Sequence, residues 1–196
     1  MILVTQIIFI LASLITFVFI LAIQFKQKNN IQKRVDLIGT IILYFSFFIS
    51  WFLGLFTLIK IEYLQPVIIL GLIVFVLGAI LRTVALKELK GMYNHSVAIK
   101  NDHKLIQSGI YSIIRHPLNL GLILEMVGLS LIVTNIITIL CLILIILIEN
   151  RRSKIEDSIL RKNFGILAEN YQAKVHAFNP FLGFFEKKLN IPYFLS

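Results

Sequence analysis

The chain of 196 residues is 58% hydrophobic and only 15% charged, which excludes a soluble domain because a fold of this size cannot hide so much apolar surface. Its net charge is +9, and the charged residues lie between apolar runs and form no basic stripe interleaved with aromatic residues. This pattern disfavours nucleic acid and favours membrane lipids with acidic headgroups as the partner. The single cysteine, Cys141, lies in an apolar run, which excludes an internal disulfide and indicates no redox or zinc role.

Five apolar runs predict transmembrane helices, at residues 2–25, 37–59, 64–86, 118–134 and 136–148. The first has no basic start and no cleavage site of small residues, so we expect it to be a retained span. Pro66 lies where the third helix would begin. The last two runs meet at Thr134-Asn135 and predict a helical hairpin. Because the fifth run is too short to span alone, we expect its helix to continue past Glu149 and to leave the membrane near Arg151-Arg152.

A polar helix is predicted beyond this point, from Arg151 to about Tyr171, with one stripe of apolar residues and an end near residues 178–180. The aromatic and basic tail at 181–196 suits a membrane surface. The prediction is one all-α membrane domain over 1–196. It has three spans in 1–86, a loop with the candidate site, the hairpin and the C-terminal helix in 87–180, and the interfacial tail.

Lysine and arginine residues predict the orientation of the spans. They gather between the first two spans, in the segment 87–115, and after Glu149, while only Lys60 lies between the second and third spans. By the positive-inside rule the N-terminus is then outside, and the C-terminus and the candidate site are cytoplasmic.

Arg115-His116-Pro117 begins the fourth span and is the first candidate site. A proline in the first turn presets a helix, and the free N–H groups and the dipole of that turn attract a carboxylate or a phosphate. Arg115 and His116 add donors at the same place. A simple helix cap with a positive-inside anchor explains the same residues.

A second candidate lies on the helix that emerges from the membrane. Arg152 and Glu156 are four residues apart and share a face, and Asp157 adds a carboxylate. These charges either make a surface ion pair or line one cavity with Arg115 and His116. No cluster of histidine and cysteine has the spacing of a metal site, so no metal is predicted.

Glu125 is a carboxylate inside the fourth span, where charge is costly and usually faces a partner or a cavity. It shares a helix face with Gly121 and Gly128, which predicts a closely packed neighbouring helix. We expect the span ends to hold Arg82 too far away to pair with Glu125.

Taken together, the motifs resemble the isoprenylcysteine carboxyl methyltransferase family. The matching residues, between about His95 and Pro180, are Gly109-x-Tyr111-x-x-x-Arg115-His116-Pro117-x-x-x-Gly121, Arg152-x-x-x-Glu156-Asp157, Phe164-Gly165 and Tyr171-x-x-x-Val175-x-x-Phe178-x-Pro180. Two positions depart from the usual family pattern. Asn119 stands in place of a tyrosine, and Asp157 stands in place of a second glutamate.

The resemblance implies an integral membrane enzyme that transfers a methyl group from S-adenosylmethionine and releases S-adenosylhomocysteine. It implies cofactor contacts from His103, Lys104, Leu105, Ile106, Tyr111, His116, Pro117, Leu118, Asn119 and Glu156. Arg152 would face the acceptor and, with Arg115, serve catalysis.

The acceptor is expected to be lipophilic or lipidated, and the oligomeric state stays open. A carboxylate acceptor needs no general base, whereas an amine or a phenol would need one, for which His116 and Glu156 are candidates. Two alternatives remain. One is a nicotinamide-dependent reductase like the steroid reductases, although Leu118 and Leu122 differ from that group's motif. The other is a non-catalytic membrane transport or assembly protein.

Overall fold

A computed structural model describes the chain at residues 7, 11, 37–60, 65–89 and 105–179. The described ranges contain helices and no strand, in agreement with the all-α prediction. The elements in chain order are α2 (Leu37–Lys60), α3 (Pro66–Glu88), the 3-10 helix η1 (Gly109–Ser112), α4 (Pro117–Val133), α5 (Ile136–Phe164) and α6 (Ile166–Lys174).

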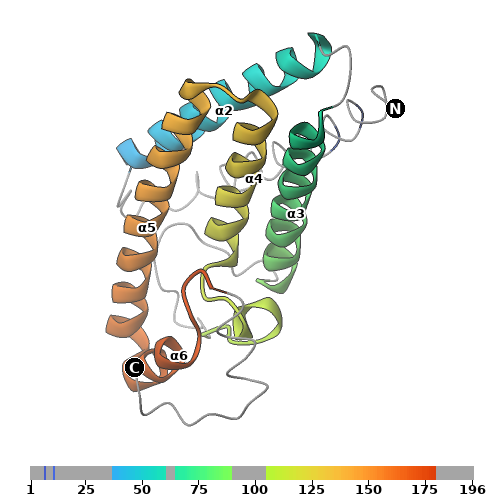
Figure 1. The fold of residues 1–196 in the computed structure, drawn as a ribbon. Coiled ribbons are helices and arrows are strands. Elements are labelled where there is room, and N and C mark those ends of the chain that lie inside the picture. The colour runs from blue at the N-terminus through green and yellow to red at the C-terminus, as the bar shows by residue number, and fades with distance from the viewer. Residues whose placement is uncertain (1–6, 8–10, 12–36, 61–64, 90–104, 180–196) are drawn as a thin grey trace.

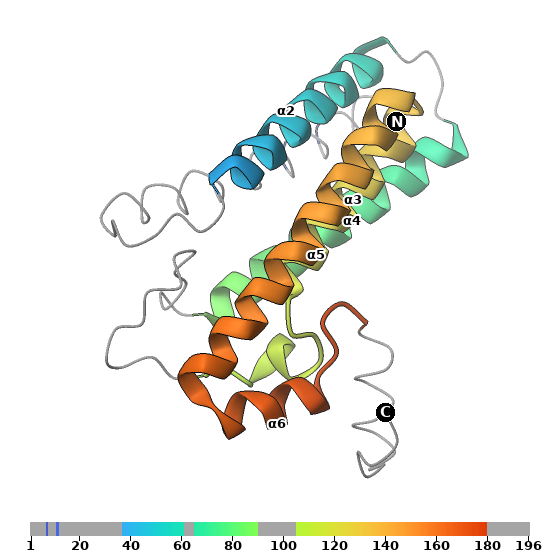
Figure 2. The ribbon, with the colours of Figure 1, turned by 90° about the vertical axis from the view of Figure 1, so that its left-hand side faces the viewer.

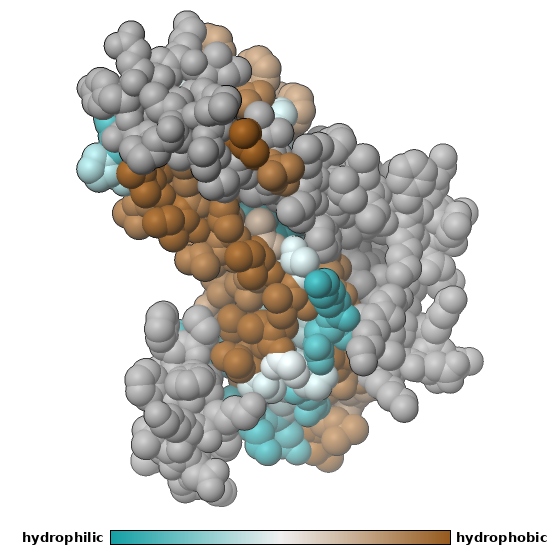
Figure 3. Space-filling view, turned by 90° about the vertical axis from the view of Figure 1, so that its right-hand side faces the viewer, coloured by the Kyte–Doolittle hydropathy of each residue, from teal (hydrophilic) through white to brown (hydrophobic). Residues whose placement is uncertain are grey.

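Helices α3, α4 and α5 run side by side along the molecule, and α2 packs near the end where α4 joins α5 (Figure 1). At the opposite end, η1 and α6 lie close to the start of α4 (Figure 2). The core between the long helices is apolar and includes Phe47, Leu72, Phe75, Met126, Leu129 and Ile145. Apolar side chains also cover much of the outer surface, whereas polar ones gather toward the end with α6 (Figure 3).

The closest helix contact joins α3 to α4. A Cβ atom added to Gly78 would lie 2.6 Å from the carbonyl oxygen of Gly121, and one added to Gly128 would lie 2.6 Å from that of Gly71. The backbones therefore touch at two points where only glycine fits. The predicted close packing on the face of Gly121 and Gly128 is confirmed.

This close approach also brings Arg82 and Glu125 together. Arg82 Nη1 donates to Glu125 Oε2 at 2.8 Å, and the two side chains are 9% and 0% exposed. The expectation that Arg82 lies too far away was wrong. Because Gly121 has no side chain, the stem of Arg82 can lie across α4 and reach the carboxylate.

The hairpin between α4 and α5 is confirmed. Thr134 ends α4 in the left-handed conformation, with φ 48°, and the Asn135 side chain caps α5 by accepting a hydrogen bond from the N–H of Ile137 at 2.9 Å. Helix α5 has 29 residues and continues past Glu149, as predicted. The proline at the first turn of α3 is also confirmed.

The prediction of one helix from Arg151 to about Tyr171 was wrong, because the chain turns at Gly165. This residue has φ 52° and separates α5 from the short helix α6. A positive φ is accessible to glycine at little cost, so the apolar stripe could continue in sequence while the helix itself changed direction.

Of the described helices, α3 is both long and apolar enough to cross a membrane, and the 17 residues of α4 form a shorter apolar helix. The number of five spans stays a prediction. The first predicted span, His103, Lys104 and the tail at 181–196 lie outside the described residues, apart from helical positions at Ile7 and Leu11.

Candidate functional site

The polar motifs of the sequence meet at the start of α4. Arg115 and His116 immediately precede this helix, and Glu156 and Asp157 come from the part of α5 that lies beside it. The structure thus brings the two motifs into contact, which is one of the two arrangements that the sequence left open. We call His116, Arg115, Glu156 and Asp157 the corner cluster.

His116 bridges the two carboxylates of the corner cluster. Its Nε2 atom lies 2.9 Å from Asp157 Oδ1, and its Nδ1 atom lies 3.3 Å from Glu156 Oε2. Asp157 is nearly buried, whereas the Glu156 side chain is 52% exposed. One carboxylate therefore holds His116 inside the fold, and the other faces outward from the same ring.

Arg115 ties three segments together. Its Nη2 atom donates to Asp157 Oδ2 at 2.9 Å, while Nη1 donates to the backbone oxygens of Gln172 at 2.7 Å and Val175 at 2.8 Å. These oxygens lie at the end of α6, where a cation is favoured by the helix dipole. The hydrogen bonds that the described residues show for the Arg115 guanidinium therefore all serve to hold the fold together.

Backbone hydrogen bonds reinforce this link. The N–H groups of Arg115 and His116 donate to the carbonyl oxygens of His176, at 2.9 Å, and Ala177, at 3.1 Å. The Tyr171 hydroxyl donates to the carbonyl oxygen of Tyr111 at 2.7 Å. The segment that follows α6 thus lies against the start of α4 and fixes its conformation.

The corner cluster changes the proton affinities of its members. Burial lowers the pKa of His116, but the hydrogen bonds to Asp157 and Glu156 outweigh burial and raise its pKa to about 9. Burial raises the pKa of Asp157, but His116 and Arg115 outweigh it and hold that pKa below its usual range. At neutral pH, His116 is therefore a cation held by two carboxylates.

Two functional candidates lie beyond the residues that the motifs predicted. Asp157, noted in the sequence as a second carboxylate beside Glu156 but without a role in the site, is the carboxylate that joins Arg115 to His116. Glu149 is 3% exposed, and its Oε1 atom lies 3.4 Å from Arg152 Nη1. The spacing of Glu149 and Arg152, three residues apart on one helix, was a signal that could have identified this pair.

The structure also describes most of the other predicted site residues. Pro117 is buried at the first position of α4, followed by Leu118, and Asn119 Nδ2 donates to Ser153 Oγ on α5 at 3.0 Å. Tyr111 is buried in η1, and burial, followed by the charge of Glu156, raises its pKa. Leu105 and Ile106 are half-buried just before η1.

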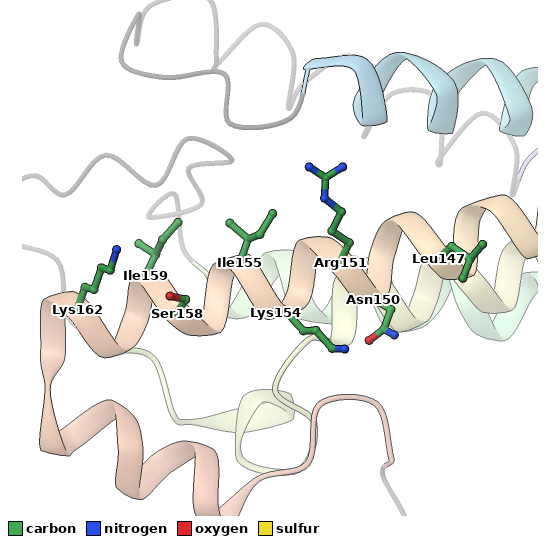
Figure 4. Close-up of a pocket in the computed structure, with 8 residues that line it drawn as sticks. All are labelled: Leu147, Asn150, Arg151, Lys154, Ile155, Ser158, Ile159 and Lys162. Carbon is green, nitrogen blue, oxygen red and sulfur yellow. The ribbon is translucent and has the colours of Figure 1, made fainter.

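A groove of about 620 Å³ runs along a different face of α5 (Figure 4). Its lining residues are Leu147, Asn150, Arg151, Lys154, Ile155, Ser158, Ile159 and Lys162. None of these belongs to the corner cluster or to the other predicted site residues, so the groove is separate from the candidate site.

Comparisons with known proteins agree with these motifs. The model of the isoprenylcysteine carboxyl methyltransferase (ICMT) family matches residues 69–162. A probable protein-S-isoprenylcysteine O-methyltransferase of Oryza sativa subsp. indica is 30% identical over 115 residues, which is 57% of this chain and 60% of the rice protein. The protein-S-isoprenylcysteine O-methyltransferase of Tribolium castaneum is 32% identical over 116 residues, which is 58% of this chain and 41% of that protein.

A solved structure is similar as well. The structure of the eukaryotic intramembrane Ras methyltransferase ICMT matches with a TM-score of 0.58 and 25% sequence identity, covering 83% of this chain and 61% of that chain. The chain thus spans about three fifths of the length of the rice relative and of this structure.

Proposed function

We propose that the chain is a member of the isoprenylcysteine carboxyl methyltransferase family, whose model matches residues 69–162, and that it transfers a methyl group from S-adenosylmethionine to a lipophilic acceptor in a membrane. The isoprenylcysteine carboxylate is the acceptor that the names of its relatives support. The observation that carries the proposal is the corner cluster, which joins the first turn of α4 to an outward-facing carboxylate on α5.

The residues present fit the cofactor. The first turn of α4 and the His116 cation suit its carboxylate, because free N–H groups and the helix dipole stabilise anions there. The half-exposed carboxylate of Glu156 suits its ammonium group. Leu105 and Ile106 offer apolar surface for adenine, and the resemblance adds His103, Lys104, Tyr111, Pro117, Leu118 and Asn119.

When bound, S-adenosylmethionine supplies an electrophilic methyl group on a sulfonium. The contribution of the protein is then mainly to orient both reactants and to exclude water. Arg152 lies one helical turn from Glu156 on α5 and is assigned to the acceptor. Arg115 acts as a positioning residue, because its guanidinium holds Asp157 and the end of α6.

The acceptor enters sideways from the lipid, and the water-soluble cofactor enters from the cytoplasmic face. The similarity to an intramembrane enzyme supports a membrane setting. The charge distribution supports the same orientation, with the corner cluster on the cytoplasmic side. The matches reported above are to methyltransferases, so the reductase and the non-catalytic alternatives are not favoured.

The test is calorimetric titration of the detergent-purified protein with S-adenosylhomocysteine, with NADPH as a parallel titrant. We expect S-adenosylhomocysteine alone to bind. Replacing Glu156 by Gln should weaken this binding roughly 10-fold or more, because a charge-assisted hydrogen bond to the cofactor amine is lost.

Glu169→Gln is the matched control, since Glu169 is an exposed carboxylate on α6 outside the corner cluster. It should bind S-adenosylhomocysteine like the wild type. Binding of NADPH alone would support a reductase, and an unchanged affinity in Glu156→Gln would contradict the role of Glu156.

A further inference from the structure

Glu149, the first residue after the apolar run at 136–148, is a buried carboxylate beside the residue assigned to the acceptor. Its side chain is 4% exposed, whereas that of Arg152, one turn later on α5, is 22% exposed. Arg152 Nη1 lies 3.4 Å from Glu149 Oε1, which is long for a charge-assisted hydrogen bond. The guanidinium therefore contacts one carboxylate inside the fold and is still accessible to a second carboxylate from outside.

The turn of α5 that carries Glu149 is fixed to α4. The Ser153 hydroxyl donates to the Glu149 carbonyl oxygen at 2.8 Å, and Asn119 Nδ2 donates to Ser153 Oγ at 3.0 Å. This turn holds the Glu149 carboxylate in its buried position. A buried carboxylate that meets a new negative charge responds by taking up a proton, because an unpaired ionised group is costly there.

The charges that act on Glu149 come from three helices. Arg152 and Glu156 lie on α5, Arg82 lies on α3, and Glu125 on α4 pairs with Arg82 at 2.8 Å. Burial raises the pKa of Glu149 and outweighs the opposite effects of Arg152 and Arg82, while Glu156 raises it further. The neutral form of Glu149 is therefore easier to reach than that of an ordinary carboxylate.

An acceptor carboxylate at Arg152 would place two carboxylates on one guanidinium. Two like charges that share a site of low dielectric do not both stay ionised, and one of them binds a proton. A free carboxyl group has a pKa of about 3.5, so the acceptor arrives ionised at neutral pH. Glu149 is the buried member of the two and therefore takes the proton.

On the basis of the proposed methyl transfer and of the role assigned to Arg152, we propose that Glu149 is a specificity-determining residue that takes up one proton when the acceptor carboxylate binds Arg152. The uptake of this proton, which comes from water, removes the repulsion between the two carboxylates. Arg152 keeps its charge for the acceptor, and the site accepts a carboxylate although it already contains one.

The proton does not take part in the methyl transfer itself. The acceptor oxygen forms a bond to the methyl carbon as the carbon–sulfur bond breaks, and the electrons of that bond stay on sulfur. The ionised acceptor has no proton to lose, so no general base is needed. The product is a neutral ester, which no longer competes for Arg152, and Glu149 returns to the proton equilibrium of the empty site.

The experiment measures the KM of N-acetyl-S-farnesylcysteine at saturating S-adenosylmethionine between pH 6 and pH 8.5, where His116 stays largely protonated. In the wild type, KM should rise at least roughly 10-fold over this range, because binding above the acceptor-free pKa of Glu149 requires the uptake of a proton. Glu149→Gln imitates the protonated carboxylate, so its KM should stay within about 2-fold of the low-pH value of the wild type. The kcat at low pH should be equal in the two proteins, since Glu149 is not assigned to the reacting atoms.

Two further variants serve as comparisons. Glu149→Asp keeps a group that titrates and should keep a rise of KM with pH. Glu169→Gln, at an exposed position of α6, should match the wild type. Unchanged S-adenosylhomocysteine affinity in each variant shows that the fold is intact.

A second measurement needs no variant. Calorimetric titration of the wild type with N-acetyl-S-farnesylcysteine, in the presence of S-adenosylhomocysteine and in buffers that differ in ionisation enthalpy, counts the protons that accompany binding. We expect an uptake of about one proton per acceptor in the pH range where KM rises.

A wild-type KM that does not rise with pH, or an equal rise in Glu149→Gln, would overturn the role of Glu149 and leave the methyl transfer in place. Acceptor binding without proton uptake throughout this pH range would overturn it as well, as would a KM of Glu149→Gln that is raised at every pH. Absence of S-adenosylhomocysteine binding to the wild type would instead overturn the proposed methyl transfer, and this role with it.

Discussion

Two adjacent carboxylates, Glu156 and Asp157, acquire different environments because consecutive residues of a helix point about 100° apart. Asp157 turns inward to Arg115 and His116, and Glu156 remains half-exposed beside the same imidazole. The sequence motifs offered a shared site of these residues as one of two interpretations. It could not predict the partners of Arg115, because two of them are backbone oxygens 57 and 60 residues away, which no side-chain pattern displays.

The raised pKa of His116 makes the stability of the site depend on pH. Its folded pKa of about 9 lies above the usual 6.5, so its contribution is fully present below pH 6.5 and is lost as the pH rises through 9. We expect the free energy of unfolding to fall by on the order of 3 kcal/mol between pH 6.5 and pH 9.5. The melting temperature in detergent should fall over the same pH range.

His116→Gln should melt lower than the wild type at pH 6.5 and should lack most of this pH-dependent decrease. Glu169→Gln serves as the control and should keep it. An equal slope in His116→Gln would mean that another group is responsible.

At the scale of elements, the α3–α4 contact positions the buried pair of Arg82 and Glu125. Gly71 faces Gly128 and Gly78 faces Gly121, so two glycines seven residues apart on each helix align in antiparallel register. The glycines and Glu125 on α4 predicted a close neighbour. Neither helix alone specifies the register, so the pairing of Arg82 with Glu125 emerged only from the packed structure.

Gly128→Ala tests this register. The added methyl group would lie 2.6 Å from two backbone atoms, so the helices must separate. We expect a loss of stability of about 1–3 kcal/mol, measured by thermal unfolding in detergent. Ile80→Ala, on the exposed face of α3, is the control and should change stability less. Equal stability of Gly128→Ala and the wild type would show that the contact can open freely.

At the scale of the whole molecule, the hairpin turn lies at one end of α4, and Arg115 and His116 of the corner cluster immediately precede its other end (Figure 1). The proposed orientation puts the corner cluster in the cytoplasm and the turn outside. Apolar run lengths and basic residues predicted this arrangement. The run lengths and basic residues did not predict the turn at Gly165, because the backbone conformation of a residue does not affect the hydropathy of the sequence.

Cysteine labelling in membrane vesicles checks the orientation. In a Cys141→Ser background, Lys162→Cys on α5 and Ile136→Cys at the hairpin turn are both at exposed positions. A membrane-impermeant maleimide should label Lys162→Cys only in inverted vesicles and Ile136→Cys only in right-side-out vesicles. The reverse pattern would invert the proposed topology.

The link between Arg115 and the segment after α6 has a consequence for biosynthesis. The start of α4 depends on hydrogen bonds to residues 172–177, which are translated after all of the long helices. A nascent chain can insert its long helices and form the hairpin while the corner cluster is still incomplete. The corner cluster is therefore completed only after the segment that follows α6 has left the ribosome.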